Sequence, residues 1–370
     1  MKCESDKNEI FYHIKMEKAY HRFHRDFPLT PIFGYNGTYP GPTFMVEKDV
    51  PIEVKWENQL PNKHLLPIDR TLHGTVDTPD VRTVVHLHGA NVEDDSNGHP
   101  EAWYSRDNKY TGHKYTREVY KYTNHQTGGT LWYHDHAIGI TRLNVYSGLV
   151  GFYLIRDFLE KRLNLPEGPY EIPLMIQDKS FSEDGSLFYP DNATPPVVHP
   201  IPSTPSFFFG NTIVVNGKIW PYLKVEPRKY RFRILNGSNL RGYELKISNG
   251  ETFHQIGTDL GLMDHPVELD SFTLEPAERI DLIIDFSKYR GQEIILMNDS
   301  PAPPNPGTEL IMKFIVDNDS ACSDVSTIPK ELMPLHKTIP ASANRERTMH
   351  LNEITDHYGR ACHLLNNKIW

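Results

Sequence analysis

The chain contains few cysteines and no long hydrophobic run. Its 370 residues include 3 cysteines, Cys3, Cys322 and Cys362, which are too scattered for a disulfide framework and leave room for one bridge at most. No window approaches the roughly 18 apolar residues of a membrane span. The first thirty residues also lack an apolar core of signal-peptide length. We therefore expect synthesis in the cytoplasm without export, and no membrane partner.

Positive charge is scarce as well. The 39 Lys and Arg residues are outnumbered by 48 Asp and Glu residues, which gives a formal net charge of −9. This balance argues against a nucleic-acid partner, because such a partner needs a basic surface to meet its phosphates. The basic cluster at residues 228–234 alternates with apolar residues, so it predicts a strand with one solvated face and one buried face.

Proline, glycine and tyrosine are abundant, with 29, 24 and 19 residues. Short runs with strand periodicity recur at residues 52–56, 83–88, 212–215 and 281–286, and turn-forming residues lie near most of them. No long amphipathic helix competes with these strands. The pattern predicts an all-β protein built from sandwiches or barrels of about 150 residues each.

A repeated sequence motif, called the phrase below, supports this division into domains of about 150 residues. Asn-Gly-Thr-Tyr-Pro-Gly-Pro at 36–42 is echoed by Asn-Gly-Lys-Ile-Trp-Pro at 216–221, and the phrase starts again as Asn-Asn-Lys-Ile-Trp at 366–370. We interpret each phrase as the opening of a domain's first sheet. The expected domains are then residues 1–157 and 158–317, followed by a linker and the start of a third domain at 318–370, cut off at its first strand.

Two His-x-His pairs dominate the chemistry of the sequence: His86 with His88, and His134 with His136. Residues two apart in a strand point to the same face, about 6.6 Å apart, so two neighbouring strands can present four imidazoles to one cavity. A single pair could arise by chance among the 19 histidines. Both pairs, however, close apolar runs, and buried imidazoles need partners. Imidazole suits copper, zinc, iron and nickel alike.

The other histidines carry no such pattern. We expect them at the surface or in loops, as with His99 in a Gly-His-Pro turn. Trp103 and Trp132 are expected in the core. A zinc hydrolase of the His-x-His-x-Asp-His type is excluded, because Ala90 and Asn91 occupy the places of the Asp and the last His.

The residues around the pairs are specific to one family. They read His-Leu-His-Gly-Ala at 86–90, Leu-Trp-Tyr-His-Asp-His at 131–136 and Thr-Arg-Leu-Asn-Val-Tyr-Ser-Gly-Leu-Val-Gly at 141–151. Together with Pro-Ala-Glu-Arg at 276–279, these runs closely resemble multicopper oxidases of the bacterial spore-coat laccase and bilirubin oxidase branch. The resemblance covers nearly the whole chain from about Tyr12 onward.

The resemblance implies cupredoxin-like Greek-key β-barrel domains that hold four coppers, and a place in the spore coat. A type 1 copper takes electrons from a phenol, a bile pigment or a similar aromatic donor. A trinuclear cluster then reduces O2 to water. Carried over by position, His86 would bind the type 2 copper, and His88, His134 and His136 would bind the type 3 pair.

Two departures from the family pattern accompany this resemblance. The third-domain signatures His-Pro-x-His-x-His and His-Cys-His are absent, and Ala361-Cys362-His363 is only a near miss that we assign to a strand. Asn97 also stands where many relatives carry Asp. We therefore expect an incomplete site that shows no turnover alone, with a separate third-domain chain as a possible partner. The alternative is an inactive copper-binding or structural spore-coat relic.

Overall fold

The computed structural model describes residues 10–190, 208–300, 306–320, 323–334, 343–356 and 358–368. Strands dominate these residues, and the helical segments are short: α1 (Thr141–Ser147), η1 (Asp94–Ser96), η2 (Arg106–Asn108), η3 (Glu160–Arg162) and η4 (Gly168–Tyr170). The all-β prediction is confirmed. None of the described helices is long and apolar enough to cross a membrane.

Two four-stranded sheets form the first unit of the molecule. One consists of β2 (Thr30–Tyr35), β1 (Ile10–His21), β4 (Ile52–Asn58) and β6 (Val119–Tyr122), in that spatial order. The other consists of β3 (Phe44–Glu47), β8 (Val150–Arg156), β7 (Gly129–Asp135) and β5 (Val85–His88). Alternation decides which side faces inward: in β4 the apolar residues are buried and the charged residues between them are partly exposed.

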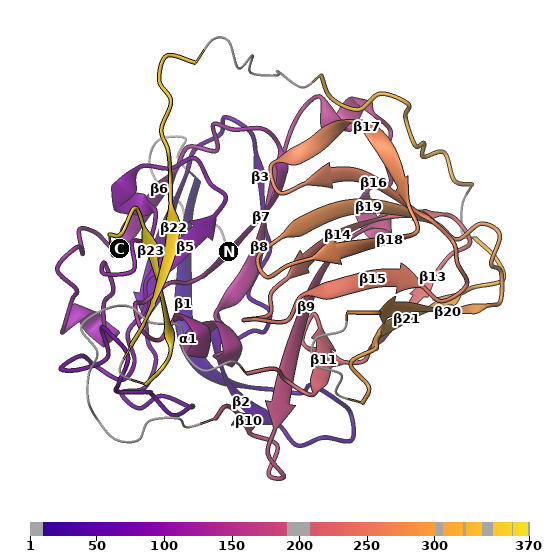
Figure 1. Ribbon diagram of the computed structural model, residues 1–370. Coiled ribbons are helices and arrows are strands. Elements are labelled where there is room, and N and C mark those ends of the chain that lie inside the picture. Colours follow the sequence, from indigo (N-terminus) through magenta and orange to yellow (C-terminus); the bar gives the residue numbers. More distant parts are fainter. Residues whose placement is uncertain are drawn as a thin grey trace.

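A larger pair of sheets forms the second unit. The first sheet follows the order β12 (Lys218–Ile219), β11 (Thr212–Val215), β9 (Glu171–Phe181), β14 (Lys229–Asn236), β19 (Arg279–Asp285), β16 (Phe253–Thr258) and β17 (Gly261–Leu269), with β10 (Leu187–Phe188) paired to β9. The second sheet consists of β13 (Tyr222–Val225), β21 (Leu310–Val316), β20 (Glu293–Asn298), β15 (Tyr243–Ile247) and β18 (Ser271–Leu274). Figure 1 shows the two units side by side.

The two units share one connectivity. In the first unit β1 lies between antiparallel β2 and parallel β4, and in the second β9 lies between antiparallel β11 and parallel β14. Likewise β3 pairs in parallel with β8, as β13 does with β21. Strands that alternate between two facing sheets in this way form Greek-key sandwiches. The repeated phrase reflects this duplication.

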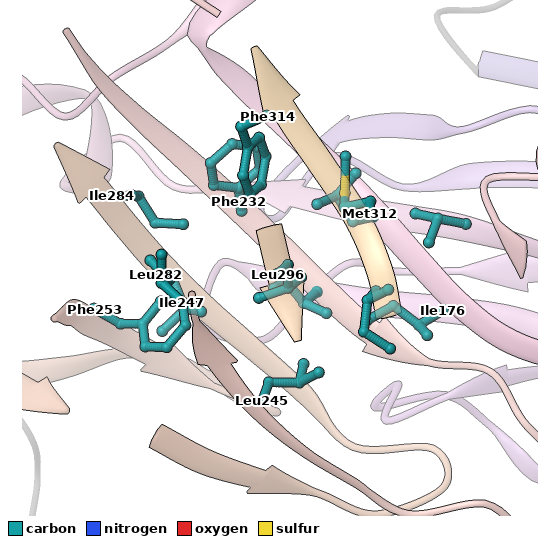
Figure 2. Packing of buried hydrophobic residues seen from close by; sticks show 14 of the residues in the cluster. Ile176, Phe232, Leu245, Ile247, Phe253, Leu282, Ile284, Leu296, Met312 and Phe314 are labelled. Carbon is teal, nitrogen blue, oxygen red and sulfur yellow. The ribbon is translucent and has the colours of Figure 1, made fainter. Parts of the chain in front are cut away.

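Each unit has its own apolar core. Phe232, Phe314 and Leu282 pack in the core of the second unit between strands of both sheets (Figure 2). The core of the first unit combines aliphatic residues with many aromatic rings, among which Trp56 and Tyr133 lie 5.3 Å apart between ring centroids. A third cluster joins the units, because Trp132 of β7 is buried together with Val214 and Leu235. Both faces of β7 are therefore covered.

A buried network of ion pairs lies at the seam between the units. Arg233 of β14 bonds Glu171 (2.6 Å), Glu160 (2.7 Å) and, across the seam, the Thr130 hydroxyl (2.9 Å). Arg231 of the same strand bonds Asp281. Both arginine side chains are almost completely buried. The prediction that one face of this strand is solvated is therefore wrong, because the first unit and the connecting segment cover that face.

A separate hairpin, β22 (Leu351–Thr355) with β23 (Ala361–Leu365), lies against the first unit (Figure 1). Arg360, which lies in the turn between these two strands, donates hydrogen bonds to Asp69 and to the Thr71 hydroxyl. Cys362 is a buried free thiol in β23, as the sequence predicted for a strand residue. In all three places the repeated phrase follows an antiparallel strand pair, so it marks a turn after the first two strands and does not open the sheet.

Candidate metal centre

The two histidine pairs lie on adjacent antiparallel strands. In the register of β5 against β7, His86 lies opposite His134 and His88 lies opposite Trp132. Residues directly opposite each other in a sheet share a face, and so do residues two apart. His136 comes directly after the last residue of β7. Local strand geometry thus places all four imidazoles on one side of the sheet edge.

The four imidazole rings converge. Ring centroids are 5.5 Å apart for His86 and His88, 5.5 Å for His86 and His134, 4.9 Å for His86 and His136, and 5.6 Å for His134 and His136. One potential ligand atom from each of His86, His88 and His134 lies within 4.8 Å of the other two. The structure therefore brings together every residue that the sequence singled out, whereas their role as metal ligands stays a prediction.

Backbone carbonyls fix the orientation of two of the rings. The Nδ1–H of His86 donates to the carbonyl of Asn97 (2.6 Å), and the Nδ1–H of His134 donates to the carbonyl of Asp135 (2.7 Å). Gly98 allows the first contact: its φ is +75°, and a Cβ there would lie 2.1 Å from the Val85 carbonyl oxygen. With Nδ1 protonated, each ring presents the bare Nε2 that a metal binds.

Burial keeps the imidazoles neutral. Desolvation lowers the pKa of His88 and of His136 to about 4, and it lowers the pKa of His86 and His134 as well. Repulsion from a positive charge on His86 further lowers the pKa of His88, His134 and His136. At neutral pH all four rings therefore carry a free lone pair, which is the form that ligates metals.

Two neighbours of the cluster gave no functional signal in the sequence. Trp132, expected only as a core residue, is buried and also stacks on His134 at 4.2 Å and on His88 at 5.3 Å between ring centroids. Arg279, from the second unit, donates a hydrogen bond to the Thr130 carbonyl (2.9 Å), and its charge lowers the pKa of His88 after the larger effect of burial. Tertiary packing, rather than sequence spacing, brings them here.

The donor set fits a metal. Nδ1 of His88 and Nε2 of His134 face each other at 3.3 Å. Because the Nδ1–H of His134 is already committed to a carbonyl, its Nε2 is an unprotonated acceptor that needs a proton or a cation beside it. A set of neutral imidazoles suits Cu(II) at least as well as the other divalent metals of this class. Copper therefore fits the residues present.

Comparison with known proteins identifies the family. The multicopper oxidase profile matches residues 76–159, which include both histidine pairs. The chain is 50% identical to the laccase of Bacillus subtilis (strain 168) over 99% of its length, and 50% identical to the laccase of Bacillus stratosphericus over 99%. The chain belongs to the multicopper oxidase family.

Solved structures agree on the fold of this multicopper oxidase chain. A laccase from Pediococcus acidilactici superposes with a TM-score of 0.73 at 26% sequence identity, over 92% of this chain and 65% of that one. The predicted cupredoxin-like architecture is thereby confirmed. The 370 residues span 73% of each Bacillus laccase. They therefore correspond to part of the length of these relatives.

Proposed function

We propose that this chain carries half of the trinuclear copper site of a laccase-type oxidoreductase, which oxidises small aromatic donors and reduces O2 to water. The convergence of four neutral imidazoles at the edge of the first unit is the observation that supports it. In this assignment His86 binds the type 2 copper, and His88, His134 and His136 bind the type 3 pair. Membership of the multicopper oxidase family supports the choice of copper.

The chain's own residues prepare the site before metal arrives. The carbonyls of Asn97 and Asp135 hold two rings with Nε2 toward the cluster, so little orientation has to be gained on binding. Trp132 stacks on two of the rings and limits the access of water to that side. Copper bound there supplies the one-electron steps that together reduce dioxygen.

Four imidazoles are half of the eight that the family resemblance gives to a trinuclear cluster. The proposal therefore includes further ligands, and the electron-entry copper, from polypeptide outside these 370 residues. By themselves the described histidines should bind copper weakly and give no blue colour, since that colour comes from a Cys thiolate bound to copper between two His ligands. The one cysteine among the described residues, Cys362, is a buried thiol of the β22–β23 hairpin.

Copper titration of the purified chain tests the proposal. We expect calorimetry to detect Cu(II) binding by the wild type and its loss in the double variant His86→Ala/His134→Ala. The matched control is His113→Ala/His125→Ala, which removes two histidines whose side chains are 66% and 79% exposed. Retained binding in the first variant, or an equal loss in the control, would place copper elsewhere and refute the assignment.

Asn97 favours a second candidate, an inactive copper-binding or structural relic. The backbone of Asn97 orients His86, but a side-chain amide cannot exchange protons as the Asp of many relatives could. The test is to mix the copper-loaded chain with a separately produced polypeptide that carries the missing ligands, and to follow oxygen uptake with a phenolic donor. Uptake supports the oxidase. Copper binding without uptake, in both wild type and Asn97→Asp, supports the relic.

A further inference from the structure

A buried carboxylate, Asp135, lies between His134 and His136 at the end of β7. Asp135 is 0% exposed, and it accepts hydrogen bonds from the backbone N–H of Val84 (3.1 Å) and of Ala137 (3.0 Å). Val84 directly precedes β5, and Ala137 directly follows the second histidine pair. One side chain therefore bonds the two histidine-bearing segments to each other.

Asn144 of helix α1 extends this connection. Its Nδ2 donates to a carboxylate oxygen of Asp135 (2.8 Å) and to the carbonyl of Arg82 (3.0 Å), and the residue is 0% exposed. Arg82 lies two residues before Val84, on the approach to β5. A single amide group thus ties helix α1 to both of the segments that carry the histidine pairs.

His64 sets the orientation of that amide. Nδ1 of His64 lies 2.9 Å from the backbone nitrogen of Leu66 and 3.2 Å from its carbonyl oxygen. Because the Leu66 N–H can only donate and Oδ1 of Asn144 can only accept, Nδ1 is the acceptor and the ring proton is on Nε2. Nε2 then donates to Oδ1 of Asn144 (3.1 Å), which leaves the Asn144 amide hydrogens directed at Asp135. Burial lowers the pKa of His64 to about 4, which is consistent with this neutral ring. His64, expected at the surface or in a loop, lies in a loop but is buried.

The second unit shows which part of this arrangement the fold itself needs. Asn298, at the end of β20, accepts hydrogen bonds from the N–H of Glu244 (2.9 Å) and of Ser300 (3.0 Å). By register these donors correspond to Val84 and Ala137. The remaining Nδ2 of Asn298 donates to the nearby Thr308 carbonyl (3.1 Å). A short amide side chain therefore suffices to join the two strands.

We propose that Asn144 is a positioning residue of the histidine cluster. Held by His64, it fixes the two His-x-His segments at the spacing in which their four imidazoles converge on the proposed copper site. The inference rests on the proposed function, because it assumes that the cluster binds copper. Hydrogen bonds behind metal ligands lower the freedom of the ligands and thereby strengthen binding, and their loss typically reduces metal affinity by about 10- to 100-fold.

The experiment compares Asn144→Ala with Asn298→Ala in the full chain. Calorimetry with Cu(II) gives the affinity, electron paramagnetic resonance gives the copper spectrum, and thermal unfolding without metal gives the stability. We expect both variants to unfold at lower temperature than the wild type. Only Asn144→Ala should bind Cu(II) about 10- to 100-fold more weakly and with an altered spectrum, since only its bonds end at the histidine segments.

His64→Phe removes the hydrogen bond that orients Asn144 but keeps an aromatic ring at position 64. This variant replaces Asn144→Ala in the test if Asn144→Ala does not fold. It should also weaken Cu(II) binding, but less. Unchanged affinity and spectrum in the folded variants would overturn the positioning role and leave the proposed function intact. An equal loss in Asn298→Ala would overturn it too, by showing a general effect of stability. A wild type that binds no copper would refute the proposed function itself.

Discussion

In the first unit β5 pairs with β7, in the second β15 pairs with β20, and each pair is joined at its end by one buried polar side chain. That side chain is Asp135 in the first unit and Asn298 in the second. Each accepts hydrogen bonds from two backbone N–H groups, and these groups occupy equivalent positions in the two units. The two strand pairs therefore share their register and the hydrogen bonds that join their ends. The scaffold alone does not make a metal centre.

The difference lies in the residues that occupy equivalent positions. By register, Lys246 corresponds to His86 and Met297 to His134, and Asp299 follows where His136 stands. Lys246 and Asp299 form an ion pair whose side chains are 41% and 43% exposed. The equivalent His86 and His136 are partly buried, and His134 is only 5% exposed. A duplicated sandwich thus uses one strand edge for a partly buried imidazole cluster and the other for a surface salt bridge.

The largest effect on stability is expected from the ion pairs at the seam between the units. If the units were independent sandwiches, loss of a seam residue would have little effect. We expect Glu171→Ala instead to lower the free energy of unfolding by about 3–5 kcal/mol, because Arg233 and Arg231 would remain buried without this partner. Urea unfolding measures it. Glu293→Ala, which removes an exposed partner of Lys313, is the control and should cost less than about 1 kcal/mol.

Acid should loosen the same seam. Burial raises the pKa of Glu171, but Arg233, Arg156 and Arg231 together lower it from 4.5 to about 2. A carboxylate with a lowered folded-state pKa stabilises the protein above its unfolded-state pKa and loses this effect as pH falls toward 2. The difference corresponds to about 3 kcal/mol at neutral pH. We expect the stability gap between wild type and Glu171→Gln to shrink between pH 4.5 and 2; a constant gap would contradict this.

Histidines placed at the equivalent positions of the second unit test whether strand register alone makes a copper site. In a background of His86→Ala/His134→Ala, we replace Lys246, Ser248, Met297 and Asp299 by His. We expect the second unit to gain Cu(II) binding, but at least about tenfold (1.4 kcal/mol) weaker than the wild-type site. The graft is more exposed and lacks the bonds of Asn144. Calorimetry distinguishes the outcomes: no binding would mean that strand register is insufficient, and wild-type affinity would mean that burial and Asn144 contribute nothing.

Strand pattern predicted the all-β class, and His-x-His spacing predicted that each histidine pair presents two rings to one face. Both follow from local rules: in β4 every second residue is apolar, and His-x-His spacing in a strand puts two rings on one face. Spacing alone left open whether the two pairs lie on neighbouring strands, and the expectation that they share one site came with the resemblance to multicopper oxidases. Local periodicity carries that much information when a unit folds around its own core.

Contacts between segments that are far apart in the sequence could not be predicted from local periodicity. The alternation around Arg231 and Arg233 is ordinary for a half-exposed strand, and only the packing of the first unit against the second buries both faces. His64 and Asn144 are 80 residues apart, and no motif links them. Arg279 approaches His88 from the other unit. The arginines depend on how the two units dock, and the contact of His64 with Asn144 depends on how a loop packs on helix α1. Residue spacing encodes neither.

The smallest expected effect concerns the ion pair that replaces the histidines in the second unit. Because Lys246 and Asp299 are both partly exposed, water screens their attraction and ordering two side chains offsets much of it. A double-mutant cycle of Lys246→Ala and Asp299→Ala should give a coupling free energy below about 1 kcal/mol, and added salt should reduce it further. Neither change should alter Cu(II) binding. A coupling of several kcal/mol, or one insensitive to salt, would show that this strand edge is more constrained than its exposure indicates. The two strand edges would then be more alike in how strongly they hold their side chains than their exposure indicates.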